Sequence, residues 1–146
     1  MSLVDVNILI RTYLLTSTAI TDPLIALIGG AGNERMYQGR LPENVTLPAV
    51  SFLTRGGGSS HKRPAGVWPS IQFDCWAESP IVARQVYRAL YDALQGLGNA
   101  PVVVDGNTYH IIQAREEVQG QDLQDIDIPG YYRVITFYQV TIRDDL

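Results

Sequence analysis

Apolar side chains recur at helical spacing in three parts of the chain, and each part opens with a capping signal. Residues 5–16 carry an apolar stripe behind Asp5, a residue type that commonly caps helices. Asp22, which is followed by a proline, is predicted to cap a short second helix. Ser79 precedes the strongest pattern, a helix over 80–96 whose expected buried stripe is Val82, Val86, Ala89, Leu90, Ala93 and Leu97.

The remaining apolar segments have the alternation or the composition of strands. Alternation is clearest in residues 70–77, whose apolar side consists of Ile71, Phe73, Cys75 and Ala77. Five further extended segments are expected, at 36–37, 47–55, 102–104, 108–115 and 131–143. Asp105-Gly106, between two of these segments, is a strong signal for a two-residue hairpin turn.

Two polar segments are interpreted as loops. Residues 56–69 are rich in glycine and serine, and a loop of about fourteen residues is long for a compact domain. Residues 116–130 contain five acidic residues and no Lys or Arg. Both segments are therefore expected to lie outside the sheet.

The order of the expected elements is α, α, β, β, β, α, β, β, β. Runs of strands and runs of helices are segregated, which predicts an α+β fold with a mainly antiparallel β-sheet and helices packed on one face. With 146 residues, the chain is expected to form a single domain over residues 1–146 that is large enough to bury its own core.

Charge and cysteine content argue against several classes of function. A net charge of −4 disfavours nucleic acid as the main ligand, because phosphate binding needs clustered Lys and Arg. A single cysteine excludes an intramolecular disulfide and suits a reducing compartment. The chain lacks both an apolar run of about 18 residues and an N-terminal signal pattern, so neither a membrane span nor secretion is expected.

Catalytic and metal-binding chemistry is not indicated. Cys75 could act as a nucleophile with His61 or His110, but its place on the apolar side of a strand favours a core role. One cysteine and two distant histidines do not supply a metal-ligand set. The glycine-rich residues 56–63 lack the spacing of a phosphate-binding loop. We therefore assign no catalytic residue, cofactor or metal.

The glycine-rich segment is the candidate contact surface because it carries Arg55, His61, Lys62, Arg63 and Trp68. Two interpretations stay open: a solvated linker, or a docking arm for an acidic protein surface or a DNA backbone. The acidic segment is either a solvated loop or the arm's complement, on the same copy or a neighbouring one, through Asp122, Asp125 and Asp127. Trp76, on the polar side of its strand, would suit an oligomer interface.

Four blocks of the chain carry a resemblance to a known family. Residues 37–42 read Tyr-x-Gly-Arg-Leu-Pro, residues 47–50 read Leu-Pro-x-Val, and residues 72–77 end in Asp-x-Trp-Ala before the helix at 80–96. In this order, and with a variable glycine-rich loop between the strands, the blocks resemble the tail completion or tail terminator proteins of long-tailed bacteriophages. The likeness in the order of elements covers most of the chain.

The resemblance implies a non-enzymatic subunit that assembles with itself into a hexameric ring. Such a ring ends the tail tube, stops its polymerisation, and offers a docking surface to the head-side connector or stopper protein. DNA would pass through the ring lumen without sequence-specific binding, and no cofactor or membrane is involved. The implied location is the head-proximal end of the virion tail, and the host cytoplasm during assembly.

Two alternatives stay open. The chain could be another connector or stopper protein of the neck, which would share the small size and the ring symmetry. It could also be a small enzyme or a nucleic-acid-binding protein.

Overall fold

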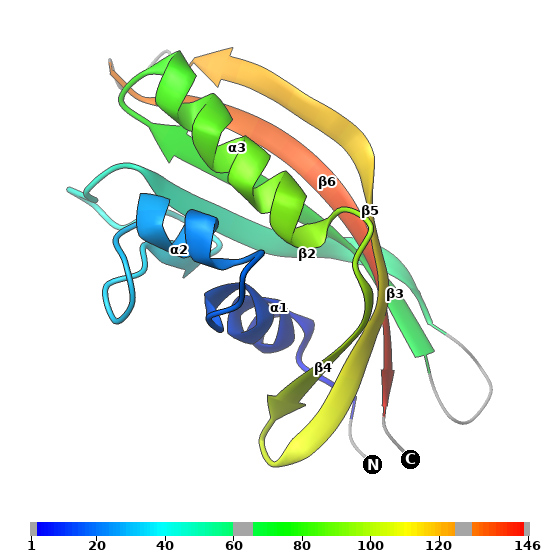
Figure 1. The fold of residues 1–146 in the computed structure, drawn as a ribbon. Helices are drawn as coiled ribbons and strands as arrows, with labels where there is room; N and C mark the ends of the chain where they lie inside the picture. Colours follow the sequence, from blue (N-terminus) through cyan, green and yellow to red (C-terminus); the bar gives the residue numbers. More distant parts are fainter. Residues whose placement is uncertain (1–2, 60–65, 125–129, 145–146) are drawn as a thin grey trace.

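In the computed structural model, residues 3–59, 66–124 and 130–144 are described, and they form one β-sheet with three helices on one face (Figure 1). The helices are α1 (Val6–Leu15), α2 (Asp22–Leu27) and α3 (Pro80–Leu94). The strands are β1 (Met36–Gln38), β2 (Ala49–Ser59), β3 (Gly66–Ala77), β4 (Gly98–Val104), β5 (Asn107–Gln124) and β6 (Tyr132–Asp144). The expected order of helices and strands is confirmed.

The strands lie in the order β1-β2-β3-β6-β5-β4. β1 runs parallel to β2, and every other neighbouring pair is antiparallel. Because α3 connects β3, near the middle of the sheet, with β4 at its far edge, the helix crosses the sheet on the helical face. The predicted α+β fold, with a mainly antiparallel sheet and helices on one face, is confirmed.

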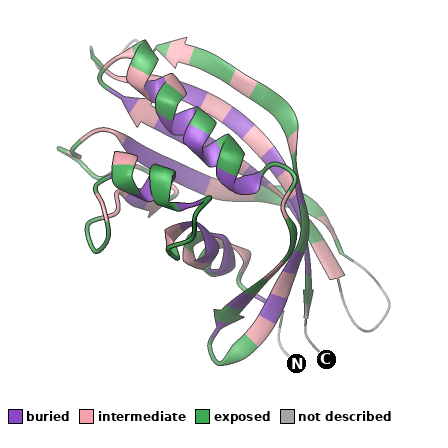
Figure 2. Ribbon diagram, viewed as in Figure 1, coloured by how far each residue is buried: buried purple, intermediate pink, exposed green. Residues whose placement is uncertain are grey.

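One hydrophobic core lies between the helices and the sheet, where buried positions of both layers face each other (Figure 2). The four alternating residues predicted for β3 are all fully buried in it. Phe73 at the centre meets the ring of Tyr138 edge-on, with 5.9 Å between centroids. In the described part of the chain, no helix lies against the opposite face of the sheet.

The helix starts follow their local signals. The Asp5 carboxylate accepts hydrogen bonds from the backbone N–H groups of Asn7 (3.0 Å) and Ile8 (3.3 Å). Ser79 Oγ accepts one from the Val82 N–H at 3.2 Å. Such caps satisfy donors that have no partner inside the helix. The Asp105-Gly106 turn is confirmed as well, since both residues have positive φ (52° and 77°), as a type I′ hairpin turn requires.

One local prediction was wrong, and another was right only in part. Asp22 is the first residue of α2 rather than its cap, and Thr21 occupies the cap position. The Asp22 carboxylate instead accepts a hydrogen bond from the Ser17 hydroxyl at 2.6 Å, because the preceding turn brings that group close. In α3 four of the six residues predicted for the buried stripe are buried, namely Val86, Ala89, Leu90 and Ala93. The other two, Val82 and Leu97, are half-buried, and the stripe also includes Ala83, Tyr87 and Leu94.

The interpretation of residues 56–69 as a loop was wrong at both ends. β2 continues to Ser59 and β3 begins at Gly66, with Gly57 paired to Pro69 and Gly58 to Trp68. A bulge between Thr54 and Gly57 absorbs the glycines, two of which have positive φ. β6 also pairs with Gly66 and Val67, so a neighbouring strand supplies the order that local composition does not predict.

The interpretation of residues 116–130 as an acidic loop was also wrong. β5 continues to Gln124 and pairs with β6 as far as Tyr132, through irregularities between Glu116 and Gln121. Polar composition predicted a loop because both faces of this part of the strand are largely exposed. Residues 125–129 lie outside the described part of the chain.

A buried hydrogen bond joins α1 to α3, and its removal tests how the two helices are held together. The Tyr13 hydroxyl donates to the Ala93 carbonyl at 2.7 Å, and burial raises the pKa of Tyr13. We expect Tyr13→Phe to lower the free energy of unfolding by about 1 kcal/mol, because a buried carbonyl loses its donor. Urea unfolding measures the change. Tyr91→Phe removes the same hydroxyl from an exposed position and should change stability little. Equal effects of the two substitutions would contradict the assignment.

Candidate functional site: a groove on the open face of the sheet

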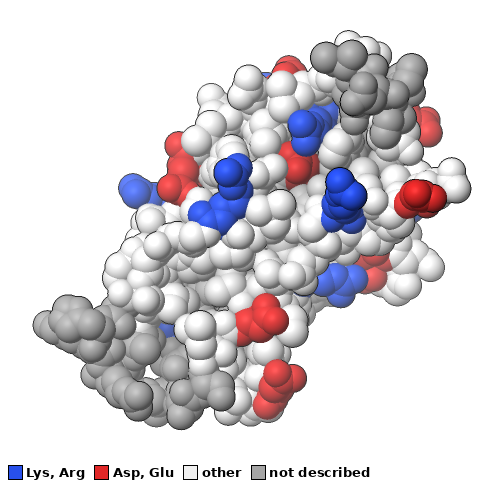
Figure 3. Space-filling view, turned by 180° about the vertical axis from the view of Figure 1, so that it is seen from behind, with Lys and Arg blue, Asp and Glu red and all other residues white. Residues whose placement is uncertain are grey.

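The open face of the sheet carries a groove of about 700 Å³, here called the Asp74 groove. Its floor comes from β2, β3 and β6, and its wall is the segment that follows β1. The lining residues are Gly39, Arg40, Leu41, Pro42, Glu43, Asn44, Ser51, Asp74, Trp76, Tyr131 and Arg133. Seen from behind (Figure 3), charged side chains are scattered over the molecule among uncharged ones.

Strand alternation explains which side chains form the floor. Residues Ile71 to Ala77 alternate along β3, so the core residues take one face and Asp74 and Trp76 take the other. Across the ladders, Ser51 pairs with Asp74 and Arg133 pairs with Trp76. Paired residues share a face, which places all four side chains together on the open side.

Two blocks that carried the family resemblance therefore meet at one place. Residues 39–42 form part of the wall, while Asp74 and Trp76 from the block at 72–77 form part of the floor. They are more than thirty positions apart in the chain, and the pairing of β1 with β2 and of β2 with β3 brings them together.

Trp76 is held from three sides. Its Nε1–H donates to Ser51 Oγ at 3.0 Å, and its ring meets Tyr131 edge-on with 6.3 Å between centroids. The Arg133 guanidinium lies 5.1 Å from the centroid of the Trp76 ring, a cation–π distance. The ring is half-buried, so the expectation that Trp76 faces the polar side is confirmed, whereas its role in an oligomer interface stays a proposal.

Asp74 is the unusual group of the groove, because this carboxylate is only 7% exposed. Gln72 Nε2 donates to its Oδ2 at 3.1 Å. Among the described residues, nothing donates a hydrogen bond to Oδ1, and Arg133 Nη1 stands 3.6 Å away, beyond hydrogen-bond distance. Burial raises the pKa of Asp74, and the opposing pull of Arg133 and Gln72 does not cancel it.

Of the contacts predicted in the glycine-rich segment, Arg55 on β2 and Trp68 on β3 are described. Arg55 donates to Gln72 Oε1 at 3.0 Å, and its guanidinium lies 5.7 Å from the centroid of the Phe137 ring. Trp68 is 37% exposed, and its indole lies against Gly58, where a Cβ atom would clash with it. His61, Lys62 and Arg63 lie outside the described residues.

Among the described residues, Asp122 lies away from the paired end of the β2–β3 hairpin. Asp122 pairs with Val134 near the start of β6, whereas the hairpin pairs with residues near Ile142 at the end of β6. Eight residues of strand separate these positions, roughly 26 Å at 3.3 Å per residue. The contacts of Asp122 with His61, Lys62 and Arg63 stay a prediction, because those three residues lie outside the described ones. Asp125 and Asp127 lie outside the described residues.

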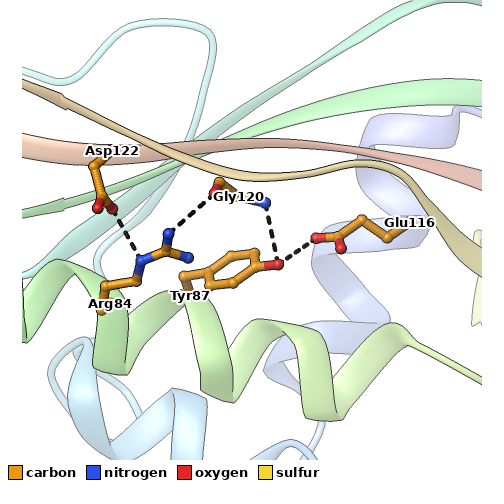
Figure 4. A network of polar contacts seen from close by, with 5 residues as sticks. All are labelled: Arg84, Tyr87, Glu116, Gly120 and Asp122. Carbon is orange, nitrogen blue, oxygen red and sulfur yellow. Dashed lines mark hydrogen bonds and ion pairs between the residues drawn. The ribbon is translucent and has the colours of Figure 1, made fainter.

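Asp122 instead belongs to a polar network that fastens α3 to the irregular part of β5 (Figure 4). Arg84 Nε lies 3.0 Å from the Asp122 carboxylate, and Arg84 Nη2 donates to the Gly120 carbonyl at 3.2 Å. The Tyr87 hydroxyl donates to Glu116 at 2.6 Å and accepts the Gly120 N–H at 3.1 Å. These bonds satisfy backbone groups that the bulged ladder leaves without strand partners.

Burial shifts the pKa of Tyr87, which lies at the centre of this network. Desolvation, together with the hydrogen bond to Glu116, raises the pKa of Tyr87 to about 12. The hydroxyl of Thr136, a fully buried residue of β6, lies 2.8 Å from Glu116 Oε2 and 2.9 Å from the Val118 carbonyl. The network is structural, since its donors and acceptors are matched to one another.

The other candidates for chemistry have a structural explanation. Cys75 is fully buried, and burial raises the pKa of its thiol well above the ordinary value, which confirms the predicted core position. No group of three or more His, Cys, Asp or Glu side chains gathers anywhere in the described ranges. Within those ranges, no helix has the length and hydropathy needed to cross a bilayer.

Comparison with known proteins gives a likeness of fold. No family model matches the chain, and neither does any curated protein. Among solved structures, the fold is similar to that of a chain in the "Virion of native gene transfer agent (GTA) particle". The TM-score is 0.66 with 14% sequence identity, and the match covers 94% of each chain. Nearly the whole of this chain thus adopts a fold found in a chain of that particle.

A substitution at Gly120 tests how closely β5 packs against Tyr87 of α3. A Cβ atom there would lie 2.7 Å from the Tyr87 ring and 2.8 Å from Val134, so Gly120→Ala should lower the free energy of unfolding by about 1–3 kcal/mol through overpacking. Gly98→Ala is the matched control, because a Cβ at Gly98 meets no described atom within 4 Å. Urea unfolding of the two variants compares them, and an equal cost would contradict the close packing.

A substitution at Asp74 tests how much stability is lost by burying its carboxylate. Because its pKa is raised in the folded state, its contribution to stability is present below the unfolded pKa and lost as the pH rises through the folded pKa. Asp74→Asn escapes this loss, so we expect the variant to be more stable than the wild type at pH 7, with the difference shrinking toward about pH 4. Urea unfolding across this range measures it.

Asp92→Asn, at an exposed position of α3, is the control and should shift stability by no more than about 0.5 kcal/mol. A less stable Asp74→Asn variant at pH 7 would mean that the attraction of Arg133 outweighs the burial of Asp74.

Proposed function

We propose that this protein is a non-enzymatic structural protein of a phage-like virion, and in particular a subunit of the ring that ends the tail tube. The observation that carries the proposal is the fold shared with a virion chain over 94% of both chains. The independent resemblance of residues 37–77 to tail terminator proteins supports the same role, because two of its blocks meet in the Asp74 groove.

The proposed mechanism is assembly by contact. Copies of the chain form a ring, six in number by the family resemblance, on the last layer of the tube. The ring blocks further addition of tube subunits and presents a surface to the head-side connector or stopper. DNA passes through the lumen without sequence readout, which agrees with the net charge of −4.

Head-to-tail closure of a ring requires two different, complementary surfaces on each subunit. The proposed contact residues come from the glycine-rich segment, from Trp76 and from the acidic segment. They are Arg55, His61, Lys62, Arg63, Trp68, Trp76, Asp122, Asp125 and Asp127.

Tube assembly in the presence of the protein tests the function. Purified protein is added to the cognate tail tube protein during polymerisation, and tube lengths are measured by electron microscopy. We expect shorter tubes of limited length with a sixfold ring at one end, because the ring occupies the site of the next layer. Tube protein alone is the control.

An unchanged length distribution with bare tube ends would contradict the terminator role. Rings that bind the portal-side assembly and ignore tube ends would identify a connector or stopper instead.

A further inference from the structure

We infer that an arginine patch on the open face of the sheet binds the acidic segment 125–129 of a neighbouring copy of this chain. The patch consists of Arg55, Trp68, Arg115 and Arg143, and it shares no residue with the lining of the Asp74 groove. The inference deepens the proposed function, and it rests on that function for the neighbouring copy being the next subunit of a ring.

Strand register brings the two arginines of β5 and β6 to one surface. Arg143 follows the buried Ile142 on β6, so alternation turns its side chain to the open face. Arg115 of β5 pairs with Gln139, which precedes the buried Val140 and therefore lies on the same face. Both arginines thus project from the side of the sheet that carries no helix in the described part of the chain.

The β2–β3 hairpin adds Trp68 and Arg55 to this surface. Gly66 of β3 pairs with Arg143, which places Trp68, two positions further along β3, beside the arginines of the neighbouring strands. The guanidinium of Arg55 lies over the Phe137 ring, on the same open face.

The patch has an excess of positive charge that solvent-borne groups can reach. Arg115 and Arg143 are both exposed, and neither forms an ion pair with a described carboxylate. The acidic residue beside them is Glu117, whose Oε1 accepts a hydrogen bond from Ser70 at 2.6 Å. Three arginines against one glutamate give the patch a net charge of +2, on a chain whose net charge is −4. An anionic partner is therefore attracted to this part of the surface.

Exposed apolar surface beside the arginines favours a protein partner over a DNA backbone. Trp68 is 37% exposed, and Val118, which pairs with Phe137, is 48% exposed. Tryptophan and arginine together are typical of the centre of protein–protein contacts. A phosphate backbone offers no apolar group to such a surface, and binding it would need a denser cluster of basic residues.

Residues 125–129 have the composition that this patch fits. They read Asp-Ile-Asp-Ile-Pro, which supplies two carboxylates for the arginines and two isoleucines for the apolar surface. They belong to the stretch 116–130, which contains five acidic residues and no Lys or Arg.

Chain length assigns the segment to a neighbouring copy. Gln124 pairs with Tyr132, and Arg115 pairs with Gln139, so seven residues of β6, roughly 23 Å at about 3.3 Å per residue, separate the two positions. Five residues that must leave Gln124 and return to Gly130 extend at most about 11 Å. The segment is too short to reach the patch of its own copy. Opposite ends of the sheet therefore carry two different, complementary surfaces, as a head-to-tail ring requires.

Peptide binding to the full chain tests the inference. The probe is the capped peptide Gln-Asp-Ile-Asp-Ile-Pro-Gly, which has the sequence of residues 124–130. The readout is the NMR resonance of the Trp68 indole N–H, at a protein concentration where the chain sediments as a monomer. We expect a saturable shift at Trp68 and a smaller one at Trp76, which lies in the Asp74 groove. The control peptide carries Asn in place of both Asp residues and should not saturate.

The double variant Arg115→Gln/Arg143→Gln should weaken peptide binding by about tenfold or more, because it removes the charge-assisted bonds. Arg88→Gln, at an exposed position of α3, is the control and should leave binding unchanged. The indole resonances of the unliganded variants establish that they are folded.

Absence of saturation with the acidic peptide, or equal binding by wild type and the double variant, would overturn the inference. Equal binding of the acidic and the Asn peptides would overturn carboxylate recognition. A short DNA duplex that shifts the Trp68 resonance where the acidic peptide does not would assign the patch to nucleic acid instead.

The tube assay separates this inference from the proposed function. If wild type limits tube length and Arg115→Gln/Arg143→Gln does so equally well, the patch does not join the copies of the ring, and the terminator function stands. If the acidic peptide binds through the two arginines while wild type leaves tube length unchanged, the contact stands and the terminator role fails.

Discussion

The packing of three helices against a single face of the sheet is the constraint on which the rest of the structure depends. It fixes which side of each strand is apolar, because alternation sends neighbouring residues to opposite faces. Phe73 and Cys75 enter the core, so Asp74 and Trp76 must take the open face. A shift of one residue in the β2–β3 register would exchange these sets and place a carboxylate in the core. The groove is thus a consequence of the same register that builds the core.

Local signals in the sequence were sufficient for much of this fold. Asp5 and Ser79 cap their helices, and Asp105-Gly106 turns a hairpin, because each of these structures depends on residues a few positions apart. The extensions of β2, β3 and β5 could not be predicted in the same way. Gly57 and Gln121 have little strand propensity of their own, and their partners Pro69 and Ile135 lie more than ten positions away.

The candidate site was harder still to predict. Alternation along β3 puts Asp74 on the polar side of the strand and gives no signal that its carboxylate is buried. Its burial comes from the wall at 39–44 and from Arg133 of β6, and these groups are distant from it in sequence. The same holds for Asp122, which was predicted to lie in an acidic loop and instead forms an ion pair with Arg84 of α3. In both cases the role of a carboxylate depends on which distant element packs beside it.

The candidate interface residues differ in whether their polar groups already have partners within the chain. Arg55 has Gln72 and Phe137, and Asp122 has Arg84, so a partner that recruits either group must replace an internal contact. Exposed pairs of this kind contribute little to stability. Replacing one with a contact to a partner therefore costs little free energy, but it also adds little free energy of binding. Asp74 differs, because its desolvation has already been imposed by the fold and Oδ1 has no hydrogen bond to lose. Oδ1 is also enclosed and lies 3.6 Å from Arg133, so a partner could reach it only by displacing the groups that surround it.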